Sequence, residues 1–147
     1  MSTRSSIKPP CRVLRIERGV LDTSVLLDYE KLPIESLPAR AAIAAVTLAE
    51  LAAGPHAVVS DIEERSRRQA RLQWADSEFT ALPFDTEAAR AYARIYAAVL
   101  ADGRKPRGAR AIDLLIAATA LSRGLPLFTR NSEDFISLHR VMQIVSV

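Results

Sequence analysis

The chain alternates between short apolar runs and longer segments of helical character. The apolar runs of strand length lie at residues 20–21, 41–47, 80–84, 125–131 and 141–147. The segments predicted to be helical lie at residues 47–54, 60–79, 85–103, 109–124 and 132–137. Strands that alternate with helices are typical of an α/β fold. The pattern therefore predicts a single domain with a mostly parallel central sheet flanked by helices.

Capping residues mark where several of these helices should begin. Thr47 followed by Glu50 matches a capping box, in which the glutamate returns to the backbone amide of the N-cap residue. Asp85 is expected to cap the helix at 85–103, and Ser132 the short helix at 132–137.

Length and composition indicate one ordinary soluble domain. The 147 residues are 49% apolar and 25% charged, and Cys11 is the single cysteine, which excludes an internal disulfide and a cysteine-based zinc site. Residues 1–18 are expected to form an N-terminal extension and residues 19–147 the folded domain. No apolar run has the ~18 residues of a membrane span, and none follows the basic N-terminus as in a secretory signal. We therefore expect a cytoplasmic protein.

One carboxylate stands in the most apolar helical segment. From Ile112 to Leu121 the polar side chains are Asp113 and Thr119, and such a segment predicts burial. An ionised carboxylate buried without a partner is unfavourable by several kcal/mol, or it neutralises through a raised pKa. Arg110 could pair with Asp113, but one ion pair would offset this desolvation poorly. A cation shared with other acids would supply the missing partner.

Three further acids follow predicted strands. Asp22 ends the first strand, Glu50 follows the second, and Asp134 comes just after the strand at 125–131; ligands of α/β sheets gather at such carboxyl ends. Each acid also has a structural alternative. Asp22 could belong to a turn or cap assisted by Thr23 or Ser24, Glu50 could belong to the capping box, and Asp134 could favour the first turn of a helix.

The four acids together predict a shared site for a hard cation. Carboxylate oxygens suit Mg²⁺, and Mn²⁺ is the second candidate. His56 and His139 have no paired spacing, so they are expected at the surface and do not indicate zinc.

Two basic clusters point to phosphate binding. The net charge is +3, and the basic residues gather in segments 103–110 and 65–71. The first contains Arg104, Lys105, Arg107 and Arg110, and the second Arg65, Arg67, Arg68 and Arg71. Such clusters are expected where a protein binds nucleic acid. A flexible basic loop and a solvated helix face would explain them equally well.

In order and spacing, several segments resemble those of the PIN-domain ribonucleases, especially the VapC-type toxins of type II toxin–antitoxin systems. The resemblance covers about residues 19–147 and rests on VLDTSVLLDY, TLAELAAG, AIDLLIAATALSRGLPLFTRNSEDF and the final apolar strand. It implies a PIN-like α/β fold, a central parallel sheet flanked by helices, with the acids meeting in a cleft. Residues 1–18 are additional to the usual start of such chains.

The resemblance also implies a site and a reaction. Asp22, Glu50 and Asp113 match the first three acids, and Asp134 is assigned as the fourth, with Asn131 open as the alternative fourth position. Asn131, Thr129 and Thr23 are expected to support the acids. The implied reaction is Mg²⁺-dependent hydrolysis of RNA by an activated water, leaving 5′-phosphate and 3′-hydroxyl ends.

The same resemblance implies partners. Arg104, Lys105, Arg107 and Arg110 lie just before Asp113 and are expected to hold the RNA backbone without choosing a base sequence. A homodimer is implied, as is a VapB-type antitoxin that inserts a segment across the cleft and places a basic side chain among the acids.

Two other functions fit parts of the pattern. A PIN-like domain without catalysis would serve as an RNA-binding or protein-interaction module, although the retained acids argue against it. A receiver-like phosphotransfer domain would need paired acids after the first strand and a lysine after a late strand, where this chain has Arg130. Metal-dependent RNA cleavage that is lost in Asp113→Asn would separate the enzyme from both.

Overall fold

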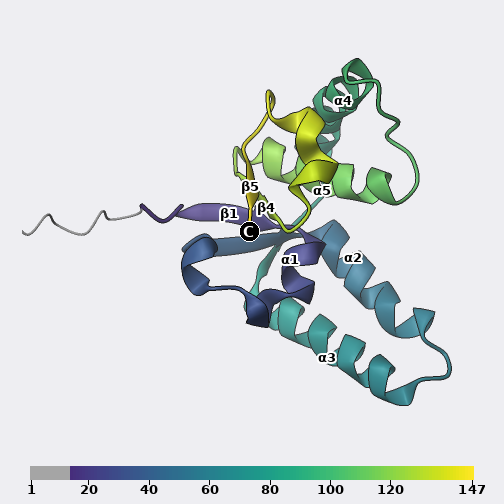
Figure 1. The fold of residues 1–147 in the computed structure, drawn as a ribbon. Helices are drawn as coiled ribbons and strands as arrows, with labels where there is room; N and C mark the ends of the chain where they lie inside the picture. The colour runs from purple at the N-terminus through teal and green to yellow at the C-terminus, as the bar shows by residue number, and fades with distance from the viewer. Residues whose placement is uncertain (1–13) are drawn as a thin grey trace, which may run out of the picture.

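A parallel sheet forms the centre of the molecule. The computed structural model describes residues 14–147, so most of the predicted N-terminal extension, Cys11 included, lies outside the described residues. Within them the sheet has five strands in the order β3-β2-β1-β4-β5, and every neighbouring pair is parallel (Figure 1). The strands are β1 (Arg18–Leu21), β2 (Arg40–Ala44), β3 (Thr80–Leu82), β4 (Leu127–Thr129) and β5 (Ile144–Ser146).

Helices cover both faces of this sheet. Helices α1 and α3 lie on one side and α4 and α5 on the other, while α2 packs against α3 and also touches α5 (Figure 1). The α-helices are α1 (Thr23–Leu27), α2 (Ala45–Ala53), α3 (Ile62–Glu78), α4 (Thr86–Ala101) and α5 (Ala109–Ser122). Short 3₁₀ helices are η1 (Tyr29–Lys31), η2 (Ile34–Ser36), η3 (Gly54–Ala57) and η4 (Ser132–Leu138). The predicted α/β architecture is therefore confirmed.

Consecutive residues of the central strands supply two separate cores. Side chains alternate between the faces of a strand, so Val20 and Leu127 join the core with α4 and α5. Leu21 and Phe128, one residue further along each strand, join the core with α1 and α3. Burial on both faces explains why these strands read as continuous apolar runs rather than alternating ones.

Gly19 in β1 lies where no side chain fits. A Cβ atom there would lie 2.4 Å from Cε2 of Phe128 and 3.3 Å from Cγ of Pro38. Because the Phe128 ring is 1% exposed, it has no room to move away. We expect Gly19→Ala to lower the free energy of unfolding by about 1–3 kcal/mol, as overpacking does elsewhere.

Urea denaturation of Gly19→Ala and Gly54→Ala measures this effect. Gly54 is a matched control, since its φ is −53° and a Cβ there would make an ordinary contact of 3.5 Å with Cδ of Arg68. The control should unfold at or slightly above the wild-type urea midpoint. Equal midpoints for both variants would contradict the close approach at Gly19.

The predicted start of the helix at 47–54 is wrong. Strand β2 ends at Ala44, and α2 begins at the next residue with no side-chain cap on its first turn. Thr47 is therefore the third residue of the helix, fully buried, and cannot act as the N-cap. The capping box does not form, which leaves the side chain of Glu50 free for another contact.

The other predicted caps have mixed outcomes. Asp85 caps α4, and its Oδ1 accepts a hydrogen bond of 3.0 Å from the Ala88 amide, as predicted. Ser132 does not cap the helix that follows it, because Asn131 occupies the N-cap position and makes no capping bond with its side chain. No helix in residues 14–147 is both long and apolar enough to cross a bilayer.

Candidate functional site

The carboxyl ends of β1 and β4 meet at the centre of the sheet. Leu21 pairs with Phe128, so the next residues, Asp22 and Thr129, lie opposite each other. The Asp22 amide donates to the Phe128 carbonyl at 3.0 Å and continues the pairing by one step. Strand order reverses direction between β1 and β4, and ligand sites of α/β sheets lie at such a point.

Asp22 is a buried carboxylate with both oxygens bonded. The residue is only 4% exposed to solvent. Oδ1 accepts from the Ser24 hydroxyl and from the Val25 amide at 3.3 Å, and Oδ2 accepts from the Thr129 hydroxyl at 2.6 Å. Asp22 is therefore also the N-cap of α1, so its structural alternative as a capping residue holds as well. Burial raises the pKa of the Asp22 carboxyl, and these hydrogen bonds counteract part of that rise.

The two hydroxyls that hold Asp22 are themselves oriented by the backbone after β4. The amide of Arg130 donates to Oγ of Ser24 at 3.0 Å, and the amide of Asn131 donates to Oγ1 of Thr129 at 3.0 Å. Each hydroxyl thus accepts from a fixed amide and gives its hydrogen to the carboxylate. Thr129 and Asn131 were expected to support the acids; Thr129 donates to Asp22, whereas Asn131 reaches it only indirectly, through a backbone amide that donates to Thr129.

Glu50 faces α1 from the second turn of α2. Its Oε1 accepts a hydrogen bond of 2.6 Å from the hydroxyl of Thr23, the residue that follows Asp22. The Thr23 hydroxyl also lies 3.3 Å from the hydroxyl of buried Thr47. The capping-box alternative for Glu50 is therefore excluded, and Thr23, one of the residues expected to support the acids, donates to Glu50.

Asp113 lies within electrostatic range of the other three acids. Its pKa is raised to about 6, first by burial and then by the charges of Asp22, Glu50 and Asp134, while Arg110 lowers it. Asp22, Glu50 and Asp134 are therefore each near enough to Asp113 for their charges to act on its carboxyl. These four residues are called the acidic cluster below.

Asp113 is less buried than its sequence predicts. The side chain is half-buried, and the preceding Ile112 is 38% exposed, so solvent reaches one side of the first turns of α5. The even apolar pattern concealed this, because periodicity does not show where a helix passes the edge of a sheet.

The fourth acid, Asp134, is exposed at the edge of the acidic cluster. Asp134 is in the first turn of η4, and its amide donates to the Asn131 carbonyl at 3.0 Å. Asp134 supplies a charge that acts on Asp113, whereas Asn131 contributes its backbone amide to Thr129.

The basic loop between α4 and α5 borders the same edge. Arg104 donates from Nη1 to the carbonyl of Glu133 at 3.3 Å, and its Nε lies 3.7 Å from Oδ2 of Asp102. Arg110 acts on Asp113, and Lys105 and Arg107 are exposed. Of the four basic residues, Arg110 is therefore the one whose charge acts on the acidic cluster.

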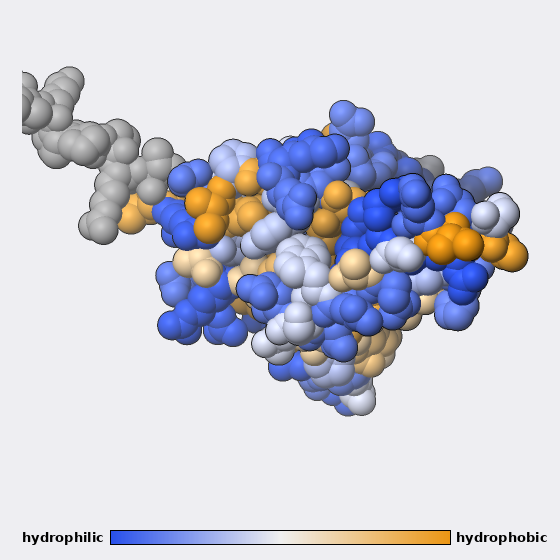
Figure 2. Space-filling view, turned by 90° about the horizontal axis from the view of Figure 1, so that it is seen from below, coloured by the Kyte–Doolittle hydropathy of each residue, from blue (hydrophilic) through white to orange (hydrophobic). Residues whose placement is uncertain are grey.

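Two arginines of the second basic cluster, Arg67 and Arg68, form ion pairs with an acid on the same helix. Arg67 and Arg68 of α3 bind the carboxylate of Glu64 at 2.8 and 2.9 Å, which also lowers the pKa of Glu64. The face of the molecule that carries α3 is mostly hydrophilic, with small hydrophobic patches (Figure 2). The solvated-face alternative therefore holds for these two arginines.

The donor set of the cluster suits Mg²⁺ or Mn²⁺. Residues 14–147 contain no group of three His, Cys, Asp or Glu side chains arranged closely enough to hold one ion together. Mg²⁺, however, is usually bound through one or two carboxylates and keeps several waters. Carboxylates whose charges act on Asp113 from three other segments fit this kind of site. His56 and His139 are exposed, as expected.

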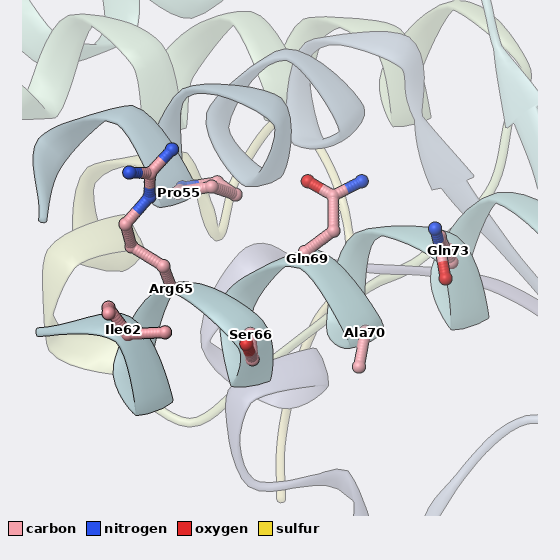
Figure 3. A pocket seen from close by; sticks show the side chains of 7 residues that line it. All are labelled: Pro55, Ile62, Arg65, Ser66, Gln69, Ala70 and Gln73. Carbon is pink, nitrogen blue, oxygen red and sulfur yellow. The ribbon is translucent and has the colours of Figure 1, made fainter.

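Two grooves of the described surface lie away from the acids. One follows α3 beside η3 (Figure 3) and is lined by Pro55, Ile62, Arg65, Ser66, Gln69, Ala70 and Gln73. A second lies between the end of α1, η1 and α3 and includes Leu27, Arg71 and Trp74. Neither is lined by an acid of the cluster, so the charges and hydrogen bonds described above, and not these grooves, mark the candidate site.

Comparisons with known proteins agree with this geometry. Residues 19–140 match the family model described as PIN domain. Ribonuclease VapC5 of Mycobacterium tuberculosis is 41% identical over 124 residues, which cover 82% of this chain and 87% of the relative. Ribonuclease VapC of Rickettsia bellii is 32% identical over 123 residues, which cover 84% of this chain and 82% of the relative.

A solved structure shows the same fold. A crystal structure of VapBC-5, a member of the VapBC family of toxin–antitoxin systems from Mycobacterium tuberculosis, superposes with a TM-score of 0.76 at 39% identity. The superposition covers 88% of this chain and 98% of that chain.

Proposed function

This chain belongs to the PIN domain family, in its VapC group, and on that premise we propose that it is a metal-dependent endoribonuclease acting as the toxin of a VapBC-type pair. The observation that carries the proposal is the acidic cluster. Asp22, Glu50 and Asp134 all raise the pKa of Asp113, an arrangement that is unfavourable unless a cation or a basic partner is bound there.

The four acids have distinct places in this proposal. A bound Mg²⁺ or Mn²⁺ would supply positive charge at the scissile phosphate and a water of lowered pKa. Asp22 and Glu50 are the fixed members, since hydroxyls of Ser24, Thr129 and Thr23 hold their carboxylates. Among the hydrogen bonds of residues 14–147, none holds the carboxylate of Asp113 or Asp134 in this way. Asp113 on α5 and Asp134 on η4 are the other two acids of the proposed site.

The product ends test the reaction class. Hydrolysis by an activated water leaves a 5′-phosphate and a 3′-hydroxyl, whereas attack by the RNA 2′-hydroxyl leaves a cyclic phosphate. We expect RNA fragments that a 5′-phosphate-dependent exonuclease degrades without prior treatment. Cyclic phosphate ends produced in EDTA would contradict the proposal.

The basic loop should hold RNA through its phosphates. Replacing Lys105 and Arg107 by glutamine is expected to weaken single-stranded RNA binding at low salt and to reduce the slope of log affinity against log salt by about 1.4, or roughly 0.7 for each phosphate contact. The preference for cleavage sequence should not change, because phosphate contacts do not read bases.

Fluorescence anisotropy with a labelled RNA in EDTA measures this difference. Arg67→Gln on α3 is the control, since its guanidinium is already bound to Glu64. A salt slope that stays the same in the loop variant, or falls equally in the control, would contradict a role of the loop.

We also propose a VapB-type antitoxin and a homodimer. The solved VapBC-5 relative is a toxin–antitoxin system, and a basic side chain inserted by a partner would relieve the repulsion at Asp113. Exposed Tyr96 and Leu100, one turn apart on α4, support self-association. Light scattering of the purified chain, alone and with its antitoxin, determines both stoichiometries.

A further inference from the structure

Thr47 is a fully buried polar residue whose place in the fold does not require a hydroxyl. It sits in the first turn of α2, is 0% exposed, and caps no helix. A valine has the same shape and would fill this space without the desolvation that a hydroxyl suffers. The contact that the hydroxyl makes is with Thr23, at 3.3 Å.

The number of hydrogens fixes the direction of this contact. Thr23 Oγ1 lies 2.6 Å from Oε1 of Glu50, a length typical of a hydroxyl that donates to a carboxylate. A carboxylate accepts, and a hydroxyl has one hydrogen, so the hydrogen of Thr23 is used by Glu50. The hydrogen between the two threonines must therefore come from Thr47.

We propose that Thr47 is a positioning residue for Glu50. Its buried hydroxyl donates to Thr23 and thereby turns the hydrogen of Thr23 toward the Glu50 carboxylate. Thr47 and Glu50 are three residues apart on α2, so both face the start of α1, where Thr23 lies. The inference rests on the proposed function, in which Glu50 is one of the acids that hold the metal.

The electrostatics of the cluster give this link its purpose. Glu50 and Asp22 both act on Asp113 with like charge, and like charges favour a greater distance between the half-buried Glu50 side chain and Asp113. The bond from Thr23 opposes that movement. Without Thr47, the Thr23 hydroxyl loses its fixed donor and rotates among other rotamers, so Glu50 is held for less of the time.

The test compares Mn²⁺ affinity among matched variants. Free Mn²⁺ is followed by its electron paramagnetic resonance signal, with Thr47→Val, Thr47→Ser and the wild type. We expect Thr47→Val to weaken Mn²⁺ binding by about tenfold, at the lower end of the range for groups that orient metal ligands. Thr47→Ser keeps the hydroxyl and should bind Mn²⁺ as the wild type does.

Thr119→Val is the matched control for loss of a buried hydroxyl. Thr119 is also 0% exposed on a helix, but its hydroxyl donates to the Leu115 carbonyl at 2.9 Å, away from the cluster. Its Mn²⁺ affinity should stay unchanged. RNA cleavage gives a second readout: for Thr47→Val the Mn²⁺ concentration of half-maximal rate should rise, while kcat at saturating Mn²⁺ stays near the wild-type value.

The outcomes separate this inference from the proposed function. Wild-type Mn²⁺ affinity in Thr47→Val, or equal losses in Thr47→Val and Thr47→Ser, would overturn the role of the hydroxyl. If Thr47→Val fails to fold, Thr23→Val is used in its place, because it breaks the same chain of hydrogen bonds. Thr23→Val is expected to weaken Mn²⁺ binding by more than tenfold, and wild-type Mn²⁺ affinity in this variant would overturn the inference. A wild type that binds Mn²⁺ but cleaves no RNA refutes the proposed function alone, and one that does not bind Mn²⁺ refutes both.

Discussion

Replacing Asp113 by asparagine is expected to stabilise the metal-free protein while it abolishes RNA cleavage. The amide keeps the shape of the side chain but removes the charge that burial, Asp22, Glu50 and Asp134 make unfavourable. Because Asp113 is partly exposed and therefore screened, the gain near pH 7.5 should be on the order of 1–2 kcal/mol rather than the larger value of its full pKa shift. The midpoint of thermal unfolding should rise by about 3–6 °C.

The pH dependence gives the sign of this effect. The pKa of Asp113 is about 6 in the folded protein, against an ordinary value of 3.8. Between these values the folded state binds more protons than the unfolded state, so stability falls as pH rises. The advantage of Asp113→Asn should therefore be small near pH 4, grow up to about pH 6 and stay constant above it.

Thermal unfolding in EDTA between pH 4 and pH 8 measures the difference. Asp76→Asn, a change of an exposed acid on α3, is the control and should follow the wild type. Mg²⁺ should then raise the unfolding temperature of the wild type more than that of Asp113→Asn, because a ligand stabilises the state that binds it. A destabilised Asp113→Asn at pH 7.5 would contradict the repulsive cluster.

Replacing Thr129 by valine is expected to destabilise the protein, unlike Asp113→Asn, and to slow RNA cleavage, as Asp113→Asn does. The change leaves Oδ2 of Asp22 and the amide of Asn131 without their partner at a fully buried position. Loss of one charged and one neutral hydrogen bond should lower the free energy of unfolding by about 2–3 kcal/mol. RNA cleavage should fall by about 10–100-fold, because Asp22 is no longer held in place.

Thr129→Ser is the control, since it keeps the hydroxyl and loses one methyl group. Urea denaturation and RNA cleavage should place it much closer to the wild type than Thr129→Val. Should both variants lose cleavage equally, the methyl group and not the hydroxyl would be the important part of Thr129.

Patterning predicted the architecture because local rules and burial agree along most of the chain. The apolar run of β1 is buried on both faces and ends at Asp22. Asp85 caps α4 because this helix begins after a loop, where its first amides need a side-chain acceptor. The acids at 22, 50, 113 and 134 could also be selected in advance, since each follows a strand or interrupts an apolar helix.

The capping box failed for a local reason. TLAE satisfies the rule from Thr47 to Glu50, but β2 passes directly into α2 at Ala45. Thr47 is therefore already the third residue of the helix and cannot be its cap. An alanine at the N-cap carries no signal, so the junction could not be read from the residue types.

Thr129 and Thr23 were expected to support the acids, but periodicity could not predict which carboxylate each hydroxyl binds, because these bonds join distant parts of the chain. Thr129 and Asp22 are 107 positions apart, and they meet through the pairing of β1 with β4. Ser24 is bound by the Arg130 amide for the same reason. Strand order, which periodicity does not determine, decides these contacts.

Cleavage of total RNA by the wild type and Asp113→Asn, each freed of bound antitoxin, tests the central claim most directly. The reactions contain Mg²⁺, Mn²⁺ or EDTA. The account predicts cleavage by the wild type with either metal, none in EDTA, and a loss of more than about 100-fold in Asp113→Asn, beyond that of groups that only orient ligands. RNA binding by both proteins without cleavage by either would contradict it and would identify a binding module.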